Sequence, residues 1–321
     1  MLDNSHKSLT EAILQTVAYS DIFDYPLTAH EIYRYLTGIN GSFETVNRVL
    51  QNGDYLTHTG IYFTLPRREE IIPIRLQREA RSRKLMPHAL RYGRILGSLP
   101  FIRMVALTGS LAVMNVSGNV DFDYMLIAAP GRVWTARAFA LLLNRTVKLW
   151  GHAICPNLIL SENALEWKQH DLYIARELCQ MIPIAGINVY QRLIHANEWA
   201  KNFLPNAFMK SNSSSRLQDV LLDSQKRASV LQKVLEFPLC GKFGDRFERW
   251  EMDRKIERFS RQEGFGEETA FNADVCQGNF DHHNKRAREA FESKLSALTI
   301  VSGGGSVRYP SLETTIGANK T

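Results

Sequence analysis

The first residues of the chain carry apolar side chains at helical spacing. Leu9, Ile13 and Val17 recur every four residues, which predicts an amphipathic helix with one buried face. Thr28 is followed three residues later by Glu31, a capping-box pattern that predicts the start of a second helix. This succession favours a small helical module at the N-terminal end.

A third helix and a hairpin complete this module. Ser42 precedes an apolar helical pattern and can cap it, because its hydroxyl can accept a backbone hydrogen bond. Residues 55–65 alternate between apolar and polar positions around Thr59-Gly60, which predicts two short strands joined by a tight turn. Residues 1–68 are therefore predicted to form a winged-helix-like module.

A basic connecting helix is predicted over residues 69–98. Residues 67–94 contain nine Lys and Arg residues against three Glu residues, and Pro73 and Pro87 are expected to interrupt the helix. The cations can contact a polyanion or form the solvated face of a connector, and the second interpretation is favoured.

Residues 99–165 change to alternating strands and helices, which predicts an α/β core with a mixed sheet. Trp134 and Trp150 flank an apolar helix there and are expected in the core. The predicted elements are, in order, a buried strand at Ile102–Leu107, a strand at Asp121–Ala128, a helix at Thr135–Trp150 and a strand at His152–Leu160.

Helical patterns predominate over residues 166–300, which are predicted to cover the cleft of the core. One short strand is expected near residues 270–275, before a helix over about 285–298. Residues 301–321 contain few apolar side chains and are expected to be a flexible tail. The fold class predicted is α/β (α+β), with an N-terminal winged-helix-like module and a C-terminal helical region.

The composition indicates a cytoplasmic protein without a membrane partner. No apolar run reaches the length of about 18 residues that a membrane span needs, and the N-terminal segment lacks the apolar stretch of a signal peptide. The four cysteines form no CxxC pair, which argues against a disulfide framework or a structural zinc site. The net charge of +6 permits a polyanionic partner, either nucleotide phosphates or nucleic acid, but does not require one.

Candidate chemistry is concentrated where Gly109-Ser110 follows the first buried strand and Asp121 and Asp123 follow ten residues later. A glycine lets backbone N–H groups approach a phosphate closely, and the serine adds a hydroxyl donor. Two carboxylates placed two residues apart on a strand point to the same face. Such a pair can bind Mg²⁺ or Mn²⁺ ions that bridge triphosphate oxygens.

The order of a strand, a Gly-Ser turn and an Asp-x-Asp strand resembles the DNA polymerase β-type nucleotidyltransferase superfamily. More loosely, the whole chain resembles uncharacterised bacterial proteins with a nucleotidyltransferase domain. The resemblance implies a nucleotidyltransferase fold in which Gly109 and Ser110 hold nucleotide phosphates, while Asp121 and Asp123 are catalytic and bind the metal. It also implies transfer of a nucleoside monophosphate from an NTP, with ATP expected, to a small-molecule or protein acceptor.

Active members of that superfamily usually supply a third carboxylate from a later strand as the general base. Asn157 stands at the corresponding place here, and an amide oxygen can contact a metal or a nucleotide but cannot accept the proton. Three alternatives follow. Glu162 or Asp171 acts as the base, the acceptor is acidic enough to need no base, or the activity is lost.

Three further residues are candidates for binding. Arg132 follows the second predicted strand and can clamp a phosphate, with a solvent-facing role as the alternative. Asp281 and His282 belong to a polar cluster before the last helix and are candidates for the acceptor site if this segment folds back over the cleft. Helix capping and surface roles are the alternative for both.

Two other functions remain open besides a Mg²⁺-dependent nucleotidyltransferase. One is a catalytically degenerate nucleotide-binding regulator whose N-terminal module docks a partner protein or DNA. The other is an ATP-activating ligase on the same fold. Arg48 is the one positive charge on the third predicted helix, so nucleic-acid binding is not favoured.

Overall fold

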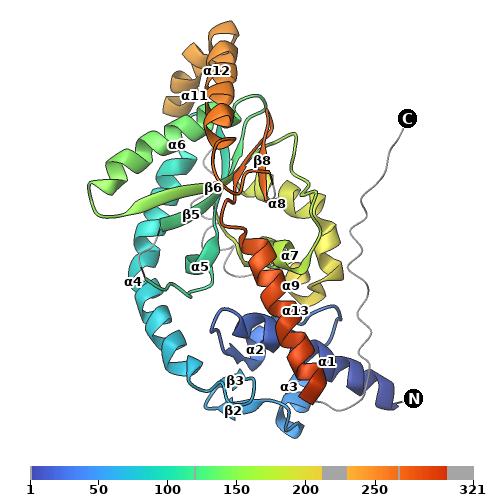
Figure 1. Ribbon diagram of the computed structural model, residues 1–321. Coiled ribbons are helices and arrows are strands. Elements are labelled where there is room, and N and C mark those ends of the chain that lie inside the picture. The colour runs from blue at the N-terminus through green and yellow to red at the C-terminus, as the bar shows by residue number, and fades with distance from the viewer. Residues whose placement is uncertain (1, 119–120, 212–229, 267, 302–321) are drawn as a thin grey trace, which may run out of the picture.

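The computed structural model describes residues 2–118, 121–211, 230–266 and 268–301. Within these residues a six-stranded mixed sheet lies at the centre, and a three-stranded sheet belongs to the N-terminal module (Figure 1). The chain is therefore a mixed α/β protein, as its sequence predicts. The predicted tail over residues 301–321 lies almost entirely outside the described residues.

The N-terminal module contains the three predicted helices and the predicted hairpin. Thr28 and Glu31 form the predicted capping box, and the Ser42 hydroxyl accepts a hydrogen bond from the Thr45 N–H at 3.2 Å. Gly60 takes a φ of +63° in the hairpin turn. The elements are α1 (Leu2–Asp21), β1 (Leu27–Thr28), α2 (Ala29–Arg34), α3 (Phe43–Asn52), β2 (Thr57–Thr59) and β3 (Tyr62–Thr64).

The basic connecting helix is one continuous element, α4 (Ile71–Gly97), which runs through Pro87 without a break. Pro73 lies in its first turn, where a backbone N–H would have no partner within the helix. Arg75 is 6% exposed and makes a bidentate ion pair with Glu31, with both N–O distances at 2.8 Å. Arg75 therefore fastens the module to the helix. Neither of the two roles expected for the cations of this segment, contact with a polyanion or exposure on a solvated face, describes it.

Further cations of the same segment act in the same way. The Arg68 guanidinium contacts Asp21 at 3.0 Å and Asp24 at 2.7 Å, and Arg78 contacts Asp24 at 3.4 Å. The far half of α4 packs on the central sheet, where the Tyr124 hydroxyl donates to the Ala89 carbonyl at 2.6 Å. The connecting helix thus binds the module and the core together.

The central sheet has the order β7-β4-β5-β6-β9-β8. β5 and β6 are parallel, and every other neighbouring pair of this sheet is antiparallel. The elements are β4 (Ile102–Leu107), α5 (Gly109–Ala112), β5 (Asp121–Ala128), α6 (Val133–Lys148), β6 (Ala153–Ser161), α7 (Leu172–Gln180), β7 (Ile182–Ala185), β8 (Thr269–Phe271) and β9 (Val275–Gly278).

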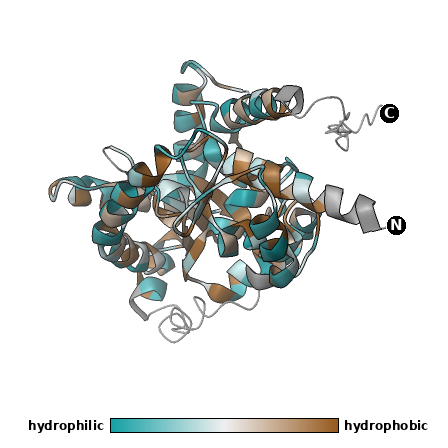
Figure 2. Ribbon diagram, turned by 90° about the horizontal axis from the view of Figure 1, so that it is seen from below, coloured by the Kyte–Doolittle hydropathy of each residue, from teal (hydrophilic) through white to brown (hydrophobic). Residues whose placement is uncertain are grey.

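Two apolar cores lie on opposite faces of this sheet. One core is covered by α4, α6 and α12 (Lys242–Phe259), and it contains Phe122, Tyr124 and Trp134. The other is covered by α7, α8 (Ile187–Ala196) and α9 (Pro205–Ser211), and it contains Met125 and Ile127. Figure 2 shows the apolar residues concentrated where these helices meet the sheet.

The region predicted as helical, 166–300, also supplies strands. β7 lies at one edge of the sheet, and β8 and β9 form a hairpin at the other edge, where a single strand was expected. Short strands of three or four residues carry too few alternating positions to be separated from a helical pattern. The remaining elements are η1 (Glu198–Asn202), α11 (Val230–Glu236), η2 (Phe237–Leu239) and α13 (His283–Val301).

The last helix returns to the module. Phe291 of α13 makes an edge-to-face contact with Tyr19 of α1 at 5.4 Å between ring centroids, and Lys294 pairs with Asp21. In Figure 1, α4 and α13 both run between the central sheet and the module. The module is thus held both by α4, which follows it directly in sequence, and by α13 from the C-terminal part of the chain.

One core prediction is wrong. Trp134 is fully buried, but Trp150 is 68% exposed, because α6 ends at Lys148 and leaves it in the turn before β6. Within the described residues, no helix combines the length and apolarity that crossing a bilayer requires.

We expect Arg75→Gln to reduce the free energy of unfolding by about 1.5–3 kcal/mol, because the change removes the charged hydrogen-bond partner of the partly buried Glu31. Arg83→Gln, which removes an exposed partner of Glu79 on the same helix, should cost less than about 1 kcal/mol. Urea unfolding of both variants measures the difference. Equal losses would show that the Arg75–Glu31 pair does not anchor the module.

Candidate functional site

The Gly-Ser turn lies directly against the aspartate strand. Gly109 has a φ of +66°, and a Cβ atom built on it would lie 2.5 Å from Oδ2 of Asp123. The preceding Thr108 N–H donates to the Asp123 carbonyl at 2.9 Å. A glycine is therefore required at position 109 for two reasons: a left-handed backbone and a close approach to a carboxylate.

Ser110 is exposed at the start of α5. This helix has four residues, so its dipole is confined to a single turn. The Ser110 carbonyl accepts a hydrogen bond from the Asn115 N–H at 2.8 Å, which fixes the backbone after the turn. The Ser110 side chain is thus available at the surface beside the aspartates.

Asp121 and Asp123 begin β5 and share one face of the sheet, because Phe122 between them points into the opposite core. Asp121 is exposed and Asp123 is half-buried. Burial and the neighbouring charge of Asp121 raise the pKa of Asp123 to about 7. The pair is therefore a site where negative charge is costly until a cation neutralises it.

Cys155, rather than Asn157, stands directly beside Asp123. The register of β5 and β6 pairs Asp123 with Cys155, whose thiol donates a hydrogen bond to the carboxylate. Burial and the nearby carboxylates raise the pKa of Cys155 to about 12, so the thiol stays protonated and donates. The motif resemblance predicted no role for this residue.

Asn157 is the extra residue of a β-bulge in β6. Tyr124 pairs with Pro156 and Met125 pairs with Leu158, which leaves Asn157 unpaired and exposed. Its side chain lines a cavity of about 80 Å³ on the aspartate face of the sheet. The other lining residues include Thr108, Met125, Tyr173, Glu177, Glu268 and Asn284.

Glu177 of α7 is the carboxylate that the sequence analysis missed. It lines the same cavity as Thr108 and Asn157, and burial together with the charge of Asp123 raises the pKa of Glu177 to about 7. The available signal was an acidic residue between Ile174 and Leu178 on a helix whose other strongly polar residues are Arg176 and Gln180. A lone acidic residue on a buried helix face needs a reason, and its electrostatic coupling to Asp123 provides one.

The two bases suggested by the sequence serve other roles. Glu162 follows the last strand residue of β6, at the end away from the aspartates, and pairs with Arg192. The Asp171 carboxylate caps α7 by accepting from the Ile174 N–H at 2.8 Å, and it also accepts from the Asn284 amide at 2.8 Å. The described structure brings neither residue to Asp123.

Arg132 is not brought to this site either. It follows the C-terminal end of β5, whose eight residues span about 26 Å from the aspartate end. Its guanidinium pairs with Asp245 of α12 at 2.7 Å and lies over the Phe101 ring. The expectation of a phosphate contact is therefore corrected to a contact between α6 and α12.

Asp281 and His282 lie between β9 and α13. This segment does fold back onto the cleft, but the Asp281 side chain is 79% exposed and His282 packs against the turn at Gly264. The next two residues, His283 and Asn284, line the cavity instead. The expectation for Asp281 and His282 is thus wrong by two residues, because the first residues of α13 line the cavity in their place.

Glu268 organises this part of the cavity wall. Its carboxylate accepts hydrogen bonds from the backbone N–H of Asn284 at 3.1 Å and of Lys285 at 2.6 Å, which caps α13. Within the described ranges, no group of three or more His, Cys, Asp or Glu side chains converges tightly enough to hold a metal ion. The aspartate pair is therefore the candidate donor set for a metal.

Comparison with protein-family models, with curated proteins and with solved structures finds no match to this chain.

The folded state raises the pKa of Asp123 from 3.8 to about 7, so the folded protein binds the proton of this carboxyl more tightly than the unfolded chain does. The folding stability that this difference contributes is present at low pH and is lost as the pH rises through about 7. Asp123→Asn cannot ionise, so without divalent metal its advantage in melting temperature over the parent protein should grow by at least about 2 °C between about pH 5 and about pH 8.5. Asp253→Asn, an exposed change on α12, serves as the control in the same thermal unfolding measurement. A pH-independent difference for Asp123→Asn would contradict the raised pKa.

Proposed function

We propose that the chain is a Mg²⁺-dependent nucleotidyltransferase that moves a nucleoside monophosphate from an NTP, with ATP as the expected donor, to a small-molecule or protein acceptor. The observation that carries this proposal is the approach of Gly109 to the carboxylate of Asp123. It brings a phosphate-binding turn and a pair of metal-binding carboxylates into contact, and this combination suits a triphosphate better than either feature alone.

The residues present fit a magnesium ion. Mg²⁺ is commonly bound by one or two carboxylates and completes its shell with water and substrate phosphates. Asp121 and Asp123 provide two such carboxylates on one face of the sheet, and the raised pKa of Asp123 favours a cation there. When bound, the metal would neutralise charge that develops on the phosphates.

Each remaining residue has a distinct role in this proposal. Backbone N–H groups at Gly109 and the Ser110 hydroxyl hold the phosphates of the nucleotide. The acceptor atom attacks the α-phosphorus, the bond to the β-phosphate oxygen breaks, and pyrophosphate leaves. Glu177 takes the proton of the acceptor, because a carboxylate with a pKa near 7 is half ionised at neutral pH and is an effective base.

The acceptor would lie in the cavity that Thr108, Asn157 and Glu177 line. Asn157 there offers an amide that can donate or accept a hydrogen bond but cannot carry a proton away. This assignment replaces Glu162 and Asp171 with Glu177 as the base and keeps Asn157 as a binding residue.

A nucleotide-binding regulator without transferase activity is the second candidate. It is favoured by one observation, namely that Glu177 does not join the aspartates in a three-carboxylate metal group within the described residues. A DNA-binding role of the module has weaker support, since α3 carries Glu44 and Arg48 as its charged residues and they cancel. An ATP-activating ligase would share the same nucleotide site.

Incubation with each α-³²P-labelled NTP, Mg²⁺ and a pool of metabolites and proteins tests the proposal. We expect labelled acceptor and pyrophosphate from the parent protein, and a rate at least about 10³-fold lower for Asp121→Asn/Asp123→Asn, because several kcal/mol of charge stabilisation is lost. Asp253→Asn should retain the rate. Label transfer that survives the double change would exclude the aspartate pair, and Mg²⁺-dependent nucleotide binding without transfer would favour the regulator.

Glu177→Gln should lower the transfer rate by about 10²–10⁴-fold and leave nucleotide affinity nearly unchanged, because it removes the proton acceptor and keeps the shape of the side chain. The acidic limb of the rate profile, which we expect near pH 7, should weaken in this variant. Glu166→Gln, an exposed change before α7, is the matched control. An unchanged rate in Glu177→Gln would rule out Glu177 as the base.

A further inference from the structure

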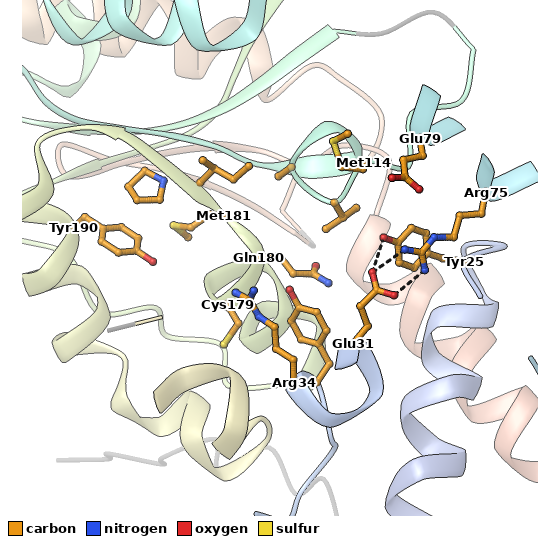
Figure 3. A pocket seen from close by; sticks show the side chains of 15 residues that line it. Tyr25, Glu31, Arg34, Arg75, Glu79, Met114, Cys179, Gln180, Met181 and Tyr190 are labelled. Atoms are coloured by element: carbon orange, nitrogen blue, oxygen red, sulfur yellow. Dashed lines mark hydrogen bonds and ion pairs between the residues drawn. The ribbon is translucent and has the colours of Figure 1, made fainter. Parts of the chain in front are cut away.

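A second and larger cavity lies between the N-terminal module and the core. Its volume is about 210 Å³, and Figure 3 shows the side chains that surround it. The module contributes Arg34 from α2, α4 contributes Arg75, and the segment after the Gly-Ser helix contributes Met114. The opposite wall comes from residues 179–183 and Tyr190. Three separate parts of the fold thus meet around one partly open space.

Arg34 is the residue that gives this cavity its charge. It makes no ion pair with any residue that the structure describes, and its buried Nε atom has no hydrogen-bond partner there. Its guanidinium lies 5.3 Å from the centre of the Tyr35 ring, a contact that cannot neutralise the charge. A partly buried cation without an anion is costly, so a negatively charged ligand would relieve this cost.

Arg176 adds to the positive potential behind the wall. It is 2% exposed and its guanidinium lies between the rings of Tyr19 and Tyr35, at 4.8 and 4.7 Å from their centres. Within the described residues it pairs with no carboxylate. Two arginines without a carboxylate partner therefore approach the same Tyr35 ring.

The remaining charges of the cavity limit the ligand to a single negative charge. Arg75 is already neutralised by Glu31 in the bidentate pair, as the dashed contacts in Figure 3 show. Glu79 also lines the cavity, and its partner Arg83 is exposed and outside the cavity, so the Glu79 carboxylate would repel a doubly charged phosphate more than a single carboxylate. A guanidinium fork matches a carboxylate in a bidentate arrangement.

The rest of the wall suits an apolar body with one or two polar positions. Met114, Met181 and Ile182 provide flexible apolar surface. The Gln180 amide and the Tyr190 hydroxyl make no hydrogen bond with the described residues, and Figure 3 shows the Tyr190 hydroxyl turned toward the side of the cavity that holds Arg34. Burial raises the pKa of Tyr190, and Arg34 is close enough to oppose that rise.

We propose that this cavity is a binding site for a small organic monocarboxylate, whose carboxylate pairs with Arg34 and whose apolar body lies against Met114 and Met181. The Tyr190 hydroxyl and the Gln180 amide bind polar atoms of the ligand. This site is separate from the aspartate pair and does not depend on nucleotidyl transfer.

The probe is 3-phenylpropanoate, and its binding to the full chain is measured by calorimetry or saturation-transfer NMR without Mg²⁺ or nucleotide. We expect saturable binding at concentrations up to about 10 mM, within the range for a ligand this small. The neutral isostere 3-phenylpropanamide and the dianion phenyl phosphate should both bind at least about tenfold more weakly, a difference equivalent to one ionic contact. Absence of saturable binding of 3-phenylpropanoate would overturn the proposal.

Variants locate the site. Arg34→Gln should weaken 3-phenylpropanoate binding about tenfold or more, whereas Arg91→Gln, an exposed change on α4 outside the cavity, should not alter it. Gln180→Glu keeps Arg34 and the side-chain volume but adds a negative charge. It should therefore weaken the binding of 3-phenylpropanoate and leave the binding of 3-phenylpropanamide unchanged. Equal behaviour of Arg34→Gln and Arg91→Gln, or tighter binding of phenyl phosphate, would contradict the proposal. Nucleotidyl transfer is assayed separately. A failure of monocarboxylate binding can therefore be distinguished from a failure of the proposed transferase activity.

Discussion

The antiparallel pairing of β4 with β5 brings the Gly-Ser turn onto the side chain of Asp123, and the candidate site depends on this approach. Leu107 pairs with Tyr124, and the Thr108 N–H continues the ladder to the Asp123 carbonyl. A side chain at position 109 would collide with that carboxylate, so the glycine allows the close approach of the turn to the carboxylate oxygens. Phe122 and Tyr124 bury the other side of the strand and hold it in place.

The second constraint on the candidate site is the cost of ionising two of its carboxylates. Asp123 and Glu177 both have pKa values raised to about 7, chiefly by burial and in part by a neighbouring carboxylate, and Cys155 stays protonated and donates to Asp123. Ionising these carboxylates costs folding free energy, and perturbed carboxylates of this kind are concentrated at functional sites. The N-terminal module is held by a different device, because the Arg75–Glu31 pair and the α13 contacts bind it to the core. This attachment creates the second cavity beside α5.

Local sequence signals predicted the parts of the site that lie close together in the chain. Gly109 and Asp123 are separated by one short segment, so strand alternation and turn chemistry were sufficient to place them. Glu177 was missed because its position depends on how α7 packs across the sheet, which no local pattern encodes. Arg132 follows the strand closely in sequence but lies at its opposite end. The register of β5 and β6 pairs Asp123 with Cys155 and leaves Asn157 in a bulge two residues further on, which strand alternation alone does not predict. β7 and β9 have four residues each, which is too few alternating positions to identify a strand from the sequence.

The claim that the aspartate pair holds a metal together with a nucleotide is tested most directly by electron paramagnetic resonance titration of Mn²⁺. The titration compares the parent protein, Asp121→Asn/Asp123→Asn and Asp253→Asn, with and without a non-hydrolysable ATP analogue. The account predicts Mn²⁺ binding that the analogue strengthens in the parent protein and in Asp253→Asn, and that is lost in the double variant. Equal Mn²⁺ binding by all three proteins, or binding that the analogue does not affect, would contradict it.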